Sequence, residues 1–502
     1  MKGQQAAMDK AIVWAIAGND SAGLAGQVAD CNTIAALGAH PCSLVTAVTA
    51  QNHDGVAALN PLNAEQVRAQ IRALQESLPA TAIKLGMLPS AEVIREVAEF
   101  IDHYAGPVVC DPVISASKGG DLMLPDAWQS FVKRILPRVT LLTPNWPEAE
   151  KLSGLRIRNA EDAEKAASTI LDLGVQAVLL KGGHAADKQP DEKFSQDFFT
   201  DGEQAFWLSS RRVDTENARG TGCRLASAIA AALAQSHDLR DAVVIGKMAI
   251  NQGLRQSYRV GAGPGPVEIR HWPDRQNDLP FLTRTPDLSH LNSRFPDCGR
   301  SPIGLYPVVD RAEWLERLLP LGVTTAQLRI KDLTGKALEK EIERGIDIAH
   351  RHRCRLFIND HWRIAIDKGA YGVHLGQEDL DEAHLSTLHV SGLRLGVSTH
   401  SYYEVSRAHA IQPSYIAVGP VYATTSKQMP WIPKGLENLA YWVNTLIYPV
   451  VAIGGITEER APLVAGTGVS GVALISAITE ANDPEQATRD LLVAVTADTG
   501  ST

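Results

Sequence analysis

Several common signatures are missing from this chain of 502 residues. Its six cysteines form no CxxC pair, which argues against a zinc ribbon or a disulfide framework and fits a reducing compartment. The net charge of −9 leaves no broad basic field, so we do not expect bulk nucleic-acid binding. No apolar run approaches the ~18 residues of a membrane span. The motif GxxxxGK[ST] is also missing, which excludes a P-loop enzyme.

The beginning of the chain contains a short apolar run but no signal-peptide cleavage pattern. Hydrophobic residues make up 45% of the chain and charged residues 21%, which is ordinary for a globular protein. The length is too great for one core and fits two or three domains. We therefore expect a cytoplasmic, multidomain α/β protein.

One segment, 271–302, shows no sustained periodicity and is rich in Pro, Asp, Arg and Ser. It predicts a linker between a domain at 1–270 and another at 303–502. Its apolar residues, Phe281, Leu282 and Phe295, are suited to docking on one of these domains.

Both domains alternate strand-like and helical runs. In the second domain, eight strand–helix units predict a closed (β/α)₈ TIM barrel, with strands at 305–310, 326–331, 355–360, 372–376, 393–399, 415–420, 450–455 and 471–476. In the first domain, strand-like runs such as AIVWAIAG and QAVLLKGG predict about eight strands in a mostly parallel, open sheet with helices on both faces.

Polar residues gather where the barrel strands are predicted to end, and barrel active sites lie at that rim. Asp360 and Asp379 follow neighbouring strands, which lie ~5 Å apart. Two carboxylates so close repel each other unless a cation lies between them, and oxygen ligands favour Mg²⁺. Arg329 and Lys331 suit phosphate oxygens. Alone, any one of these residues would more often be a solvated loop residue, and it is their joint pattern at successive strand ends that indicates a site.

The segment from Gly304 to Ile478 resembles thiamine-phosphate synthase. The matching motifs are GLYPVVD, QLRIKD, FINDHWRIAI, GVHLGQEDL, GVSTH, TTSKQMP, AIGGI and ALISAI. The resemblance implies that thiazole phosphate displaces the diphosphate of hydroxymethylpyrimidine diphosphate, which yields thiamine phosphate and pyrophosphate. His374 lies inside a strand, and we favour a structural role for it.

The resemblance also implies residue roles. Asp360 and Asp379 would bind Mg²⁺. The pyrimidine diphosphate would be held by Gln327, Arg329, Lys331, Asn359, Ser398 and Lys427, with Lys427 also catalytic. The thiazole phosphate would be held by Thr424, Ser426, Gly455, Ile475 and Ser476. Ser426 stands where the family usually has Thr, and the hydroxyl is retained.

In the first domain, the strongest local signal is NARGTGCRLASAIAAALA at 217–234, a glycine-rich turn that opens a helix. Free N–H groups at a helix start attract phosphate, and Cys223 there is expected to have a lowered thiol pKa. A plain helix cap with a small buried thiol explains this turn equally well. Polar residues at other strand ends complete a set typical of phosphoryl transfer: Asp111, Lys118, Asn145, Glu148 and Lys181.

Residues 11–272 resemble the hydroxymethylpyrimidine and phosphomethylpyrimidine kinases, which have a ribokinase-like three-layer αβα sandwich. Gln51 would then bind the pyrimidine, and Gly220, Gly222 and Cys223 would form a catalytic anion hole. Mg-ATP would lie near Asp111, Lys118, Asn145, Glu148 and Lys181. Two motifs depart from the family pattern. In GNDSAGLAG, Leu24 replaces a glycine and the usual proline is absent, and after GTGC, Arg224 replaces a threonine.

Together, the two resemblances imply consecutive steps of thiamine biosynthesis, with small-molecule substrates, ATP and Mg²⁺. No nucleic acid or membrane is expected, and a homodimer is left open. One rival is a pyridoxal kinase fused to a thiazole tautomerase. The residues expected to bind a diphosphate, Gln327, Arg329, Lys331 and Lys427, argue against a tautomerase. A second rival keeps the synthase but makes the first domain a degenerate sensor or docking module, as Leu24 and Arg224 suggest.

Overall fold

The chain forms two compact units, described here by a computed structural model of residues 9–114, 122–182, 193–423 and 433–496. The first unit comprises 1–273 and 277–287, and the second comprises 274–276 and 288–502. Among the helices described, none is both long and apolar enough to cross a bilayer.

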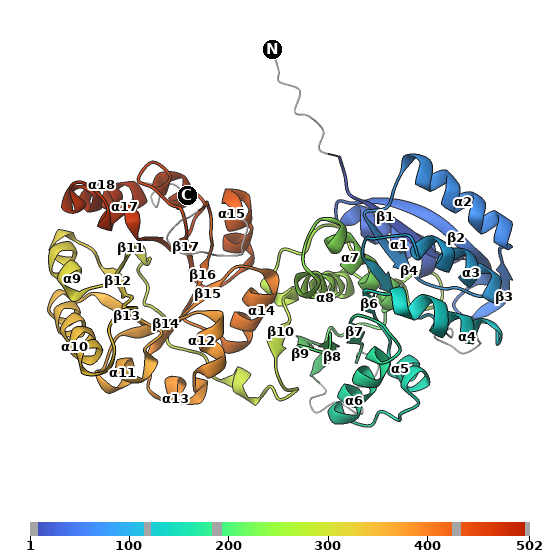
Figure 1. Cartoon of the computed structure of the whole chain (residues 1–502), viewed down its shortest axis with the longest axis horizontal. Coiled ribbons are helices and arrows are strands. Elements are labelled where there is room, and N and C mark those ends of the chain that lie inside the picture. The colour runs from blue at the N-terminus through green and yellow to red at the C-terminus, as the bar shows by residue number, and fades with distance from the viewer. Residues whose placement is uncertain (1–8, 115–121, 183–192, 424–432, 497–502) are drawn as a thin grey trace, which may run out of the picture. The chain divides into compact units, whose positions relative to one another are not determined.

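The first unit is built on an open sheet of ten strands in the order β10-β9-β8-β7-β6-β5-β4-β1-β2-β3 (Figure 1). Its central pairs, from β2 through β1 and β4 to β7, are parallel, as predicted. The strands are β1 (Ile12–Asp20), β2 (His40–Gln51), β3 (Val56–Pro61), β4 (Ala82–Leu85), β5 (Val108–Cys110), β6 (Leu141–Leu142), β7 (Val178–Leu180), β8 (Phe194–Thr200), β9 (Ala205–Arg211) and β10 (Phe281–Thr283).

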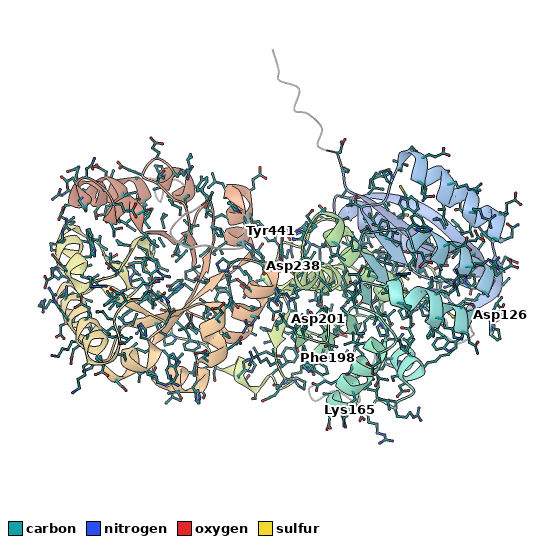
Figure 2. The ribbon with its side chains drawn as sticks, in the orientation of Figure 1. Asp126, Lys165, Phe198, Asp201, Asp238 and Tyr441 are labelled. Carbon is teal, nitrogen blue, oxygen red and sulfur yellow. The ribbon has the colours of Figure 1, made fainter. Side chains whose placement is uncertain are left out.

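Helices cover this sheet because each presents an apolar stripe to it. Several begin at a side-chain cap: Asp238, for example, accepts a hydrogen bond from the Asp241 N–H (2.8 Å; Figure 2). The helices are α1 (Gly26–Ala36), α2 (Ala64–Ser77), α3 (Ala91–Ile101), α4 (Ala127–Ser130), α5 (Trp146–Ser153), α6 (Ala160–Leu171), α7 (Thr221–Ala234) and α8 (Leu239–Arg255).

The antiparallel edge of the sheet is rich in aromatic residues. Phe198 on β8 lies 5.0 Å from Trp207 on β9, measured between ring centroids (Figure 2). Strand β10 then pairs antiparallel with β9 and adds the buried Leu282. Part of the segment predicted as a linker is therefore a strand of the first unit. Phe295, further along, is buried in the second unit against His389.

The second unit is a closed barrel of eight parallel strands (Figure 1). The ring closes because β11 pairs with both β12 and β18. All eight strands lie where the sequence predicted them: β11 (Gly304–Val309), β12 (Thr325–Leu328), β13 (Arg355–Asn359), β14 (Gly372–Leu375), β15 (Arg394–Thr399), β16 (Tyr415–Val418), β17 (Val450–Ile453) and β18 (Gly471–Leu474).

Helices surround the barrel. They are α9 (Ala312–Leu318), α10 (Gly335–His352), α11 (Trp362–Asp367), α12 (Gln377–Glu382), α13 (Leu385–Val390), α14 (Tyr402–Ile411), α15 (Gly435–Thr445), α16 (Ala461–Ala465), α17 (Ser476–Thr479) and α18 (Pro484–Thr496). Inside the ring, the rings of Tyr306, Phe357 and Tyr415 meet, with Phe357 and Tyr415 edge-to-face at 5.1 Å. This aromatic layer fills the centre of the barrel.

The substitution Phe357→Ala should lower the free energy of unfolding of the barrel by about 3–5 kcal/mol, because it removes a fully buried ring at the barrel centre. Hydrogen–deuterium exchange, read peptide by peptide in urea, measures this loss. A matched control, Val390→Ala, removes a side chain that is 89% exposed and should have little effect. Equal exchange in both variants would contradict the assignment of Phe357 to the core.

Candidate active sites

In the first unit, α7 begins at a turn that only glycine fits. Gly220 precedes the helix with a φ of 72°, and a Cβ added there would lie 2.3 Å from the Leu24 carbonyl oxygen. The start of α1 is also near, because the Gly26 N–H donates to the Cys223 thiol. Two helix N-termini therefore meet at Cys223, and such termini favour negative charge.

An ion pair lies beside this turn. Lys181, which follows β7, donates to the Asp111 carboxylate, which follows β5 (2.6 Å). A Cβ added at Gly222 would lie 3.1 Å from both the Asp111 Oδ2 and the Lys181 Nζ atoms. The structure thus brings together these two predicted ATP-binding residues and the predicted anion hole.

Asn145 and Glu148 form a capping box at the start of α5. The Asn145 side chain accepts from the Glu148 N–H (2.9 Å), and the Glu148 carboxylate accepts from the Asn145 N–H (2.8 Å). Asn145 also forms a parallel bridge with Lys181. Burial raises the pKa of Glu148 to about 7; the charge of Lys181 opposes this shift and that of Asp111 adds to it.

Gln51 lies at the end of β2, beside the turn that follows β1. Its N–H donates to the Ser21 hydroxyl, which in turn donates to the Gln51 carbonyl (each 2.9 Å). The Asp20 carboxylate holds the turn by accepting from the N–H groups of Ala22, Leu24 and Ala25. Lys118 lies outside the described residues.

The predicted low pKa of Cys223 is wrong. Burial raises the pKa of the Cys223 thiol to about 11, although the positive charge of Lys84 and the Gly26 N–H act in the opposite direction. The sequence indicated the helix start correctly but gave no measure of how far the thiol is removed from water. The group is therefore a neutral thiol at physiological pH.

Lys84 and Asp30 were not singled out from the sequence. Both are fully buried, and the Lys84 ammonium donates to Asp30 Oδ2 (2.7 Å) while the Ser227 hydroxyl donates to Asp30 Oδ1 (2.8 Å). Burial alone would lower the pKa of Lys84. The acidic neighbours of Lys84, Asp30 first, outweigh this effect and raise the pKa. The sequence feature that could have pointed to this pair is Lys84 itself, a lysine within the otherwise apolar strand AIKL.

The raised pKa of Cys223 predicts slow alkylation. A thiol with a pKa of about 11 is almost wholly protonated at pH 8, so iodoacetamide should modify Cys223 at least tenfold more slowly than free cysteine. The rate should rise with pH up to about 11. Site-resolved mass spectrometry gives the rate, and modification faster than that of free cysteine at pH 8 would show that the pKa is instead lowered.

In the barrel, a chain of hydrogen bonds links two residues of the predicted pyrimidine site. The Gln327 amide donates to the Tyr306 hydroxyl (3.3 Å), which lies 2.8 Å from the Tyr415 hydroxyl. His374 continues the chain, with Nδ1 2.7 Å from the Tyr415 hydroxyl and Nε2 2.7 Å from the Ser398 hydroxyl. Gln327 and Ser398 are thereby held across the barrel interior.

His374 is neutral in this chain. Burial lowers its pKa to about 4, with the charge of Arg329 acting in the same direction. The sequence favoured a structural role, and His374 does contact a core tyrosine. Through Nε2 it also orients Ser398, whose position the sequence linked to substrate.

The two predicted metal ligands face each other. Burial, the charge of Asp360 and a hydrogen bond with Asp360 all raise the pKa of Asp379. Asp360 also forms an ion pair with Lys331. Its φ of 61° is left-handed, a conformation that Asp and Asn tolerate better than most residues. The backbone therefore turns sharply at the end of β13.

These carboxylates fit Mg²⁺ as a partial ligand set. Among the described residues, no three His, Cys, Asp or Glu side chains cluster tightly enough to hold a metal alone. Mg²⁺ commonly takes only one or two carboxylates and completes its octahedron with water and substrate phosphates. An acid pair whose mutual repulsion raises a pKa is the donor arrangement that a divalent cation would relieve.

The other predicted rim residues lie at the ends of their strands. Asn359 ends β13 and is largely buried. Gly455, after β17, has a φ of 63°, and a Cβ there would lie 2.3 Å from the Ala423 carbonyl oxygen, so only glycine fits. Ile475 and Ser476 form the junction between β18 and α17. Thr424, Ser426 and Lys427 lie outside the described residues.

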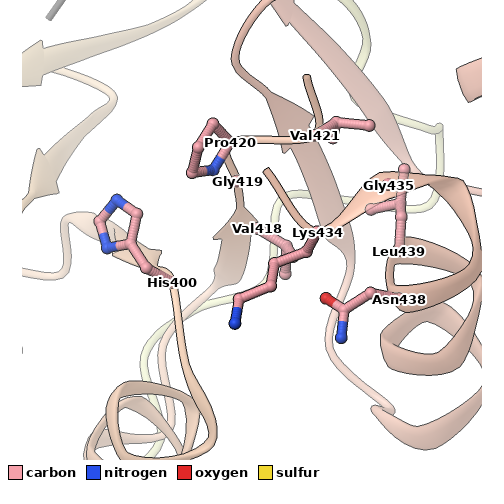
Figure 3. A pocket seen from close by; sticks show the side chains of 9 residues that line it. All are labelled: His400, Val418, Gly419, Pro420, Val421, Lys434, Gly435, Asn438 and Leu439. Carbon is pink, nitrogen blue, oxygen red and sulfur yellow. The ribbon is translucent and has the colours of Figure 1, made fainter. Parts of the chain in front are cut away.

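A hollow lies beside the end of β16, lined by residues that include His400, Pro420, Lys434 and Leu439 (Figure 3). One of its polar residues, His400, is engaged by Glu404, with His400 Nδ1 2.7 Å from the carboxylate. Of the predicted site residues that the structure describes, none lines this hollow.

Comparison with known proteins gives a family match for each unit. Residues 305–478 match the model of the thiamine monophosphate synthase family, and residues 20–268 match that of phosphomethylpyrimidine kinase. The thiamine-phosphate synthase of Photorhabdus laumondii is 56% identical over 194 residues, which cover 38% of this chain and 90% of the relative. The chain belongs to the thiamine-phosphate synthase family.

Solved structures resemble the first unit. The phosphomethylpyrimidine kinase of Clostridium difficile is 35% identical, covers 48% of this chain and 97% of its own, and has a TM-score of 0.42. The pyridoxal kinase of Staphylococcus aureus in complex with AMP-PCP is 30% identical, covers 53% and 95%, and has a TM-score of 0.48.

The two family matches indicate a bifunctional enzyme of thiamine biosynthesis. The synthase barrel is preceded in the same chain by a kinase domain, which uses ATP as a co-substrate. Neither the fusion of pyridoxal kinase with a tautomerase nor the sensor module is favoured, because both units match enzyme families of one pathway.

Proposed function

We propose that the kinase domain phosphorylates hydroxymethylpyrimidine twice, and that the synthase barrel condenses the resulting diphosphate with thiazole phosphate. The observation that best supports this proposal is that each domain contains a group of polar and charged groups suited to its step. One joins N–H groups of a helix start to the Asp111–Lys181 pair. The other joins the Asp360–Asp379 acid pair to Lys331.

In the kinase domain, the γ-phosphoryl group of ATP passes to a hydroxyl or a phosphate oxygen of the pyrimidine. The N–H groups at the start of α7, with Gly220, Gly222 and Cys223, would stabilise the charge on the transferred group. Lys181 lies beside them and would contact the ATP phosphates, with Lys118 assigned the same role from sequence. Gln51 would hold the pyrimidine. The neutral Cys223 thiol would not act as a thiolate base.

Asp111, Asn145 and Glu148 would lie near Mg-ATP. The pKa of Glu148, about 7, means that its proton is easily displaced by a nearby cation at neutral pH. When bound, Mg²⁺ would offset the charge of the ATP phosphates. The ion pair with Lys181 keeps Asp111 oriented toward the helix start.

In the barrel, diphosphate leaves the pyrimidine carbon and the thiazole nitrogen attacks that carbon. Lys331 and Arg329, with Lys427, would stabilise the charge that develops on the departing diphosphate. Mg²⁺ held by Asp360 and Asp379 would supply further positive charge there. Gln327, Asn359 and Ser398 would orient the pyrimidine, and the thiazole phosphate would be held by Thr424, Ser426, Gly455, Ile475 and Ser476.

A coupled assay tests both activities. The purified protein, given hydroxymethylpyrimidine, thiazole phosphate, ATP and Mg²⁺, should form thiamine phosphate with two ATP consumed per product. If the product forms only from pre-made pyrimidine diphosphate, the kinase proposal fails. If pyrimidine diphosphate accumulates without thiamine phosphate, the synthase proposal fails.

The substitution Asp360→Asn should lower kcat/KM for the condensation at least about a hundredfold, since it removes a charged ligand next to the diphosphate site. Asparagine tolerates the left-handed backbone, so the fold should persist. ATP consumption with hydroxymethylpyrimidine should stay within about twofold of wild type.

The matched variant Asp111→Asn should show the opposite pattern, with phosphorylation lost and condensation of supplied diphosphate retained. A folded Asp360→Asn protein that lost both activities would contradict two separate sites.

We also propose that the protein is located in the cytoplasm. Whether it forms a homodimer can be tested by light scattering.

A further inference from the structure

Arg224 is a buried cation without an acidic partner. It lies in the first turn of α7 and is only 5% exposed. Its Nη1 donates to the carbonyl oxygens of Leu24 (3.1 Å) and Arg219 (3.5 Å). Within the described ranges, no carboxylate forms an ion pair with it, whereas the buried Lys84 and Lys247 and the partly buried Lys181 each have one.

A buried cation whose hydrogen bonds go only to carbonyl groups is costly, and proteins usually pair it. Asp30 and Glu268 favour the charged form of Arg224 without forming an ion pair with it. A guanidinium carries five N–H donors in a planar fork that matches phosphate oxygens. In Arg224 only Nη1 makes hydrogen bonds within the described part of the chain, so the Nε and Nη2 donors remain for a further ligand. An anion with oxygen acceptors would fit these donors.

The start of α7 has two distinct sides. A Cβ added at Gly222 would meet Asp111 and Lys181, the side assigned to ATP. A Cβ added at Gly220 would instead lie 2.2 Å from Arg224 Nη1 and 2.3 Å from the Leu24 carbonyl oxygen. Arg224 therefore adjoins Gly220, whereas the Asp111–Lys181 pair adjoins Gly222.

That second side adjoins the predicted pyrimidine site. Leu24 belongs to the turn after β1, and Ser21 of the same turn exchanges hydrogen bonds with the backbone of Gln51. Asp20 holds the turn together through three N–H groups. Leu24 and Arg224, two of the departures from the kinase motifs, are thus in direct contact beside the turn that carries Ser21.

We propose that Arg224 binds the phosphate already carried by the pyrimidine monophosphate, and so favours the second phosphorylation over the first. The inference rests on the proposed kinase function. In the first step the acceptor is a neutral alcohol and leaves the guanidinium without its anion. In the second step the acceptor phosphate supplies it, while the N–H groups of the helix start face the incoming γ-phosphoryl group.

The test compares Arg224→Gln with wild type on both acceptors, in the full-length protein. Glutamine can still donate to the Leu24 carbonyl but carries no charge. KM for the pyrimidine monophosphate should rise at least about tenfold, the loss expected for one charge-assisted hydrogen bond, while KM for hydroxymethylpyrimidine should change less than about twofold. Arg224→Lys should recover part of the loss.

Isothermal titration with the pyrimidine monophosphate in the absence of ATP gives a readout that is independent of turnover, and its affinity should fall by the same factor. The control Arg158→Gln removes an exposed arginine just before α6 and should leave both KM values unchanged.

The outcomes separate the two claims. If wild type phosphorylates neither acceptor, the kinase function fails. If wild type is active and Arg224→Gln slows both acceptors equally, Arg224 acts on the transferred phosphoryl group or the fold, and the inference is overturned. Unchanged kinetics and unchanged monophosphate affinity in the variant would overturn it as well. Should the glutamine variant not fold, Arg224→Lys replaces it. A partial loss of affinity confined to the monophosphate would support the inference, and a monophosphate KM and affinity equal to those of wild type would overturn it.

Discussion

The kinase domain depends on one buried ion pair, that between Lys84 and Asp30. It joins the central strand β4 to helix α1, and the Ser227 hydroxyl adds helix α7 to the same carboxylate. Removing one member of such a pair typically costs about 3–5 kcal/mol, because the other charge is left buried and unbalanced. Both α1 and α7 begin at the Cys223 turn, so this interaction fixes the two helix starts relative to each other. The positive charge of Lys84 also lies near enough to act on Cys223.

The interior of the barrel is held together by neutral groups instead. It is crossed by the chain of Gln327, Tyr306, Tyr415, His374 and Ser398, and the charged groups Asp360, Asp379 and Lys331 lie beyond it, after the strand ends. The lowered pKa of His374 keeps the chain neutral at physiological pH. A satisfied neutral network holds side chains in one arrangement without the desolvation cost of ions. The acidic pair at the rim then retains the mutual repulsion that a cation would remove.

The sequence allowed the barrel and its rim to be predicted in detail. Strand periodicity gave all eight strands, and parallel strands deliver their ends to one edge, so Asp360 and Asp379 could be expected to meet. Lys84 and Asp30 were missed because their pairing joins segments 54 residues apart along the chain. The Tyr306–Tyr415 contact, 109 residues apart, was missed for the same reason. The pKa of Cys223 was predicted in the wrong direction because burial depends on the whole tertiary structure, whereas a helix start can be read locally.

Strand β10 has a consequence for dissecting the two activities. A kinase fragment ended at residue 270, the boundary that composition suggests, would lack the strand that covers β9. The apolar β9 edge, with its backbone donors and acceptors unpaired, would then be open to another chain, a recognised route to aggregation. An isolated domain extended to residue 287 keeps its own edge strand. Part of the segment between the two domains thus covers the sheet edge of the first domain.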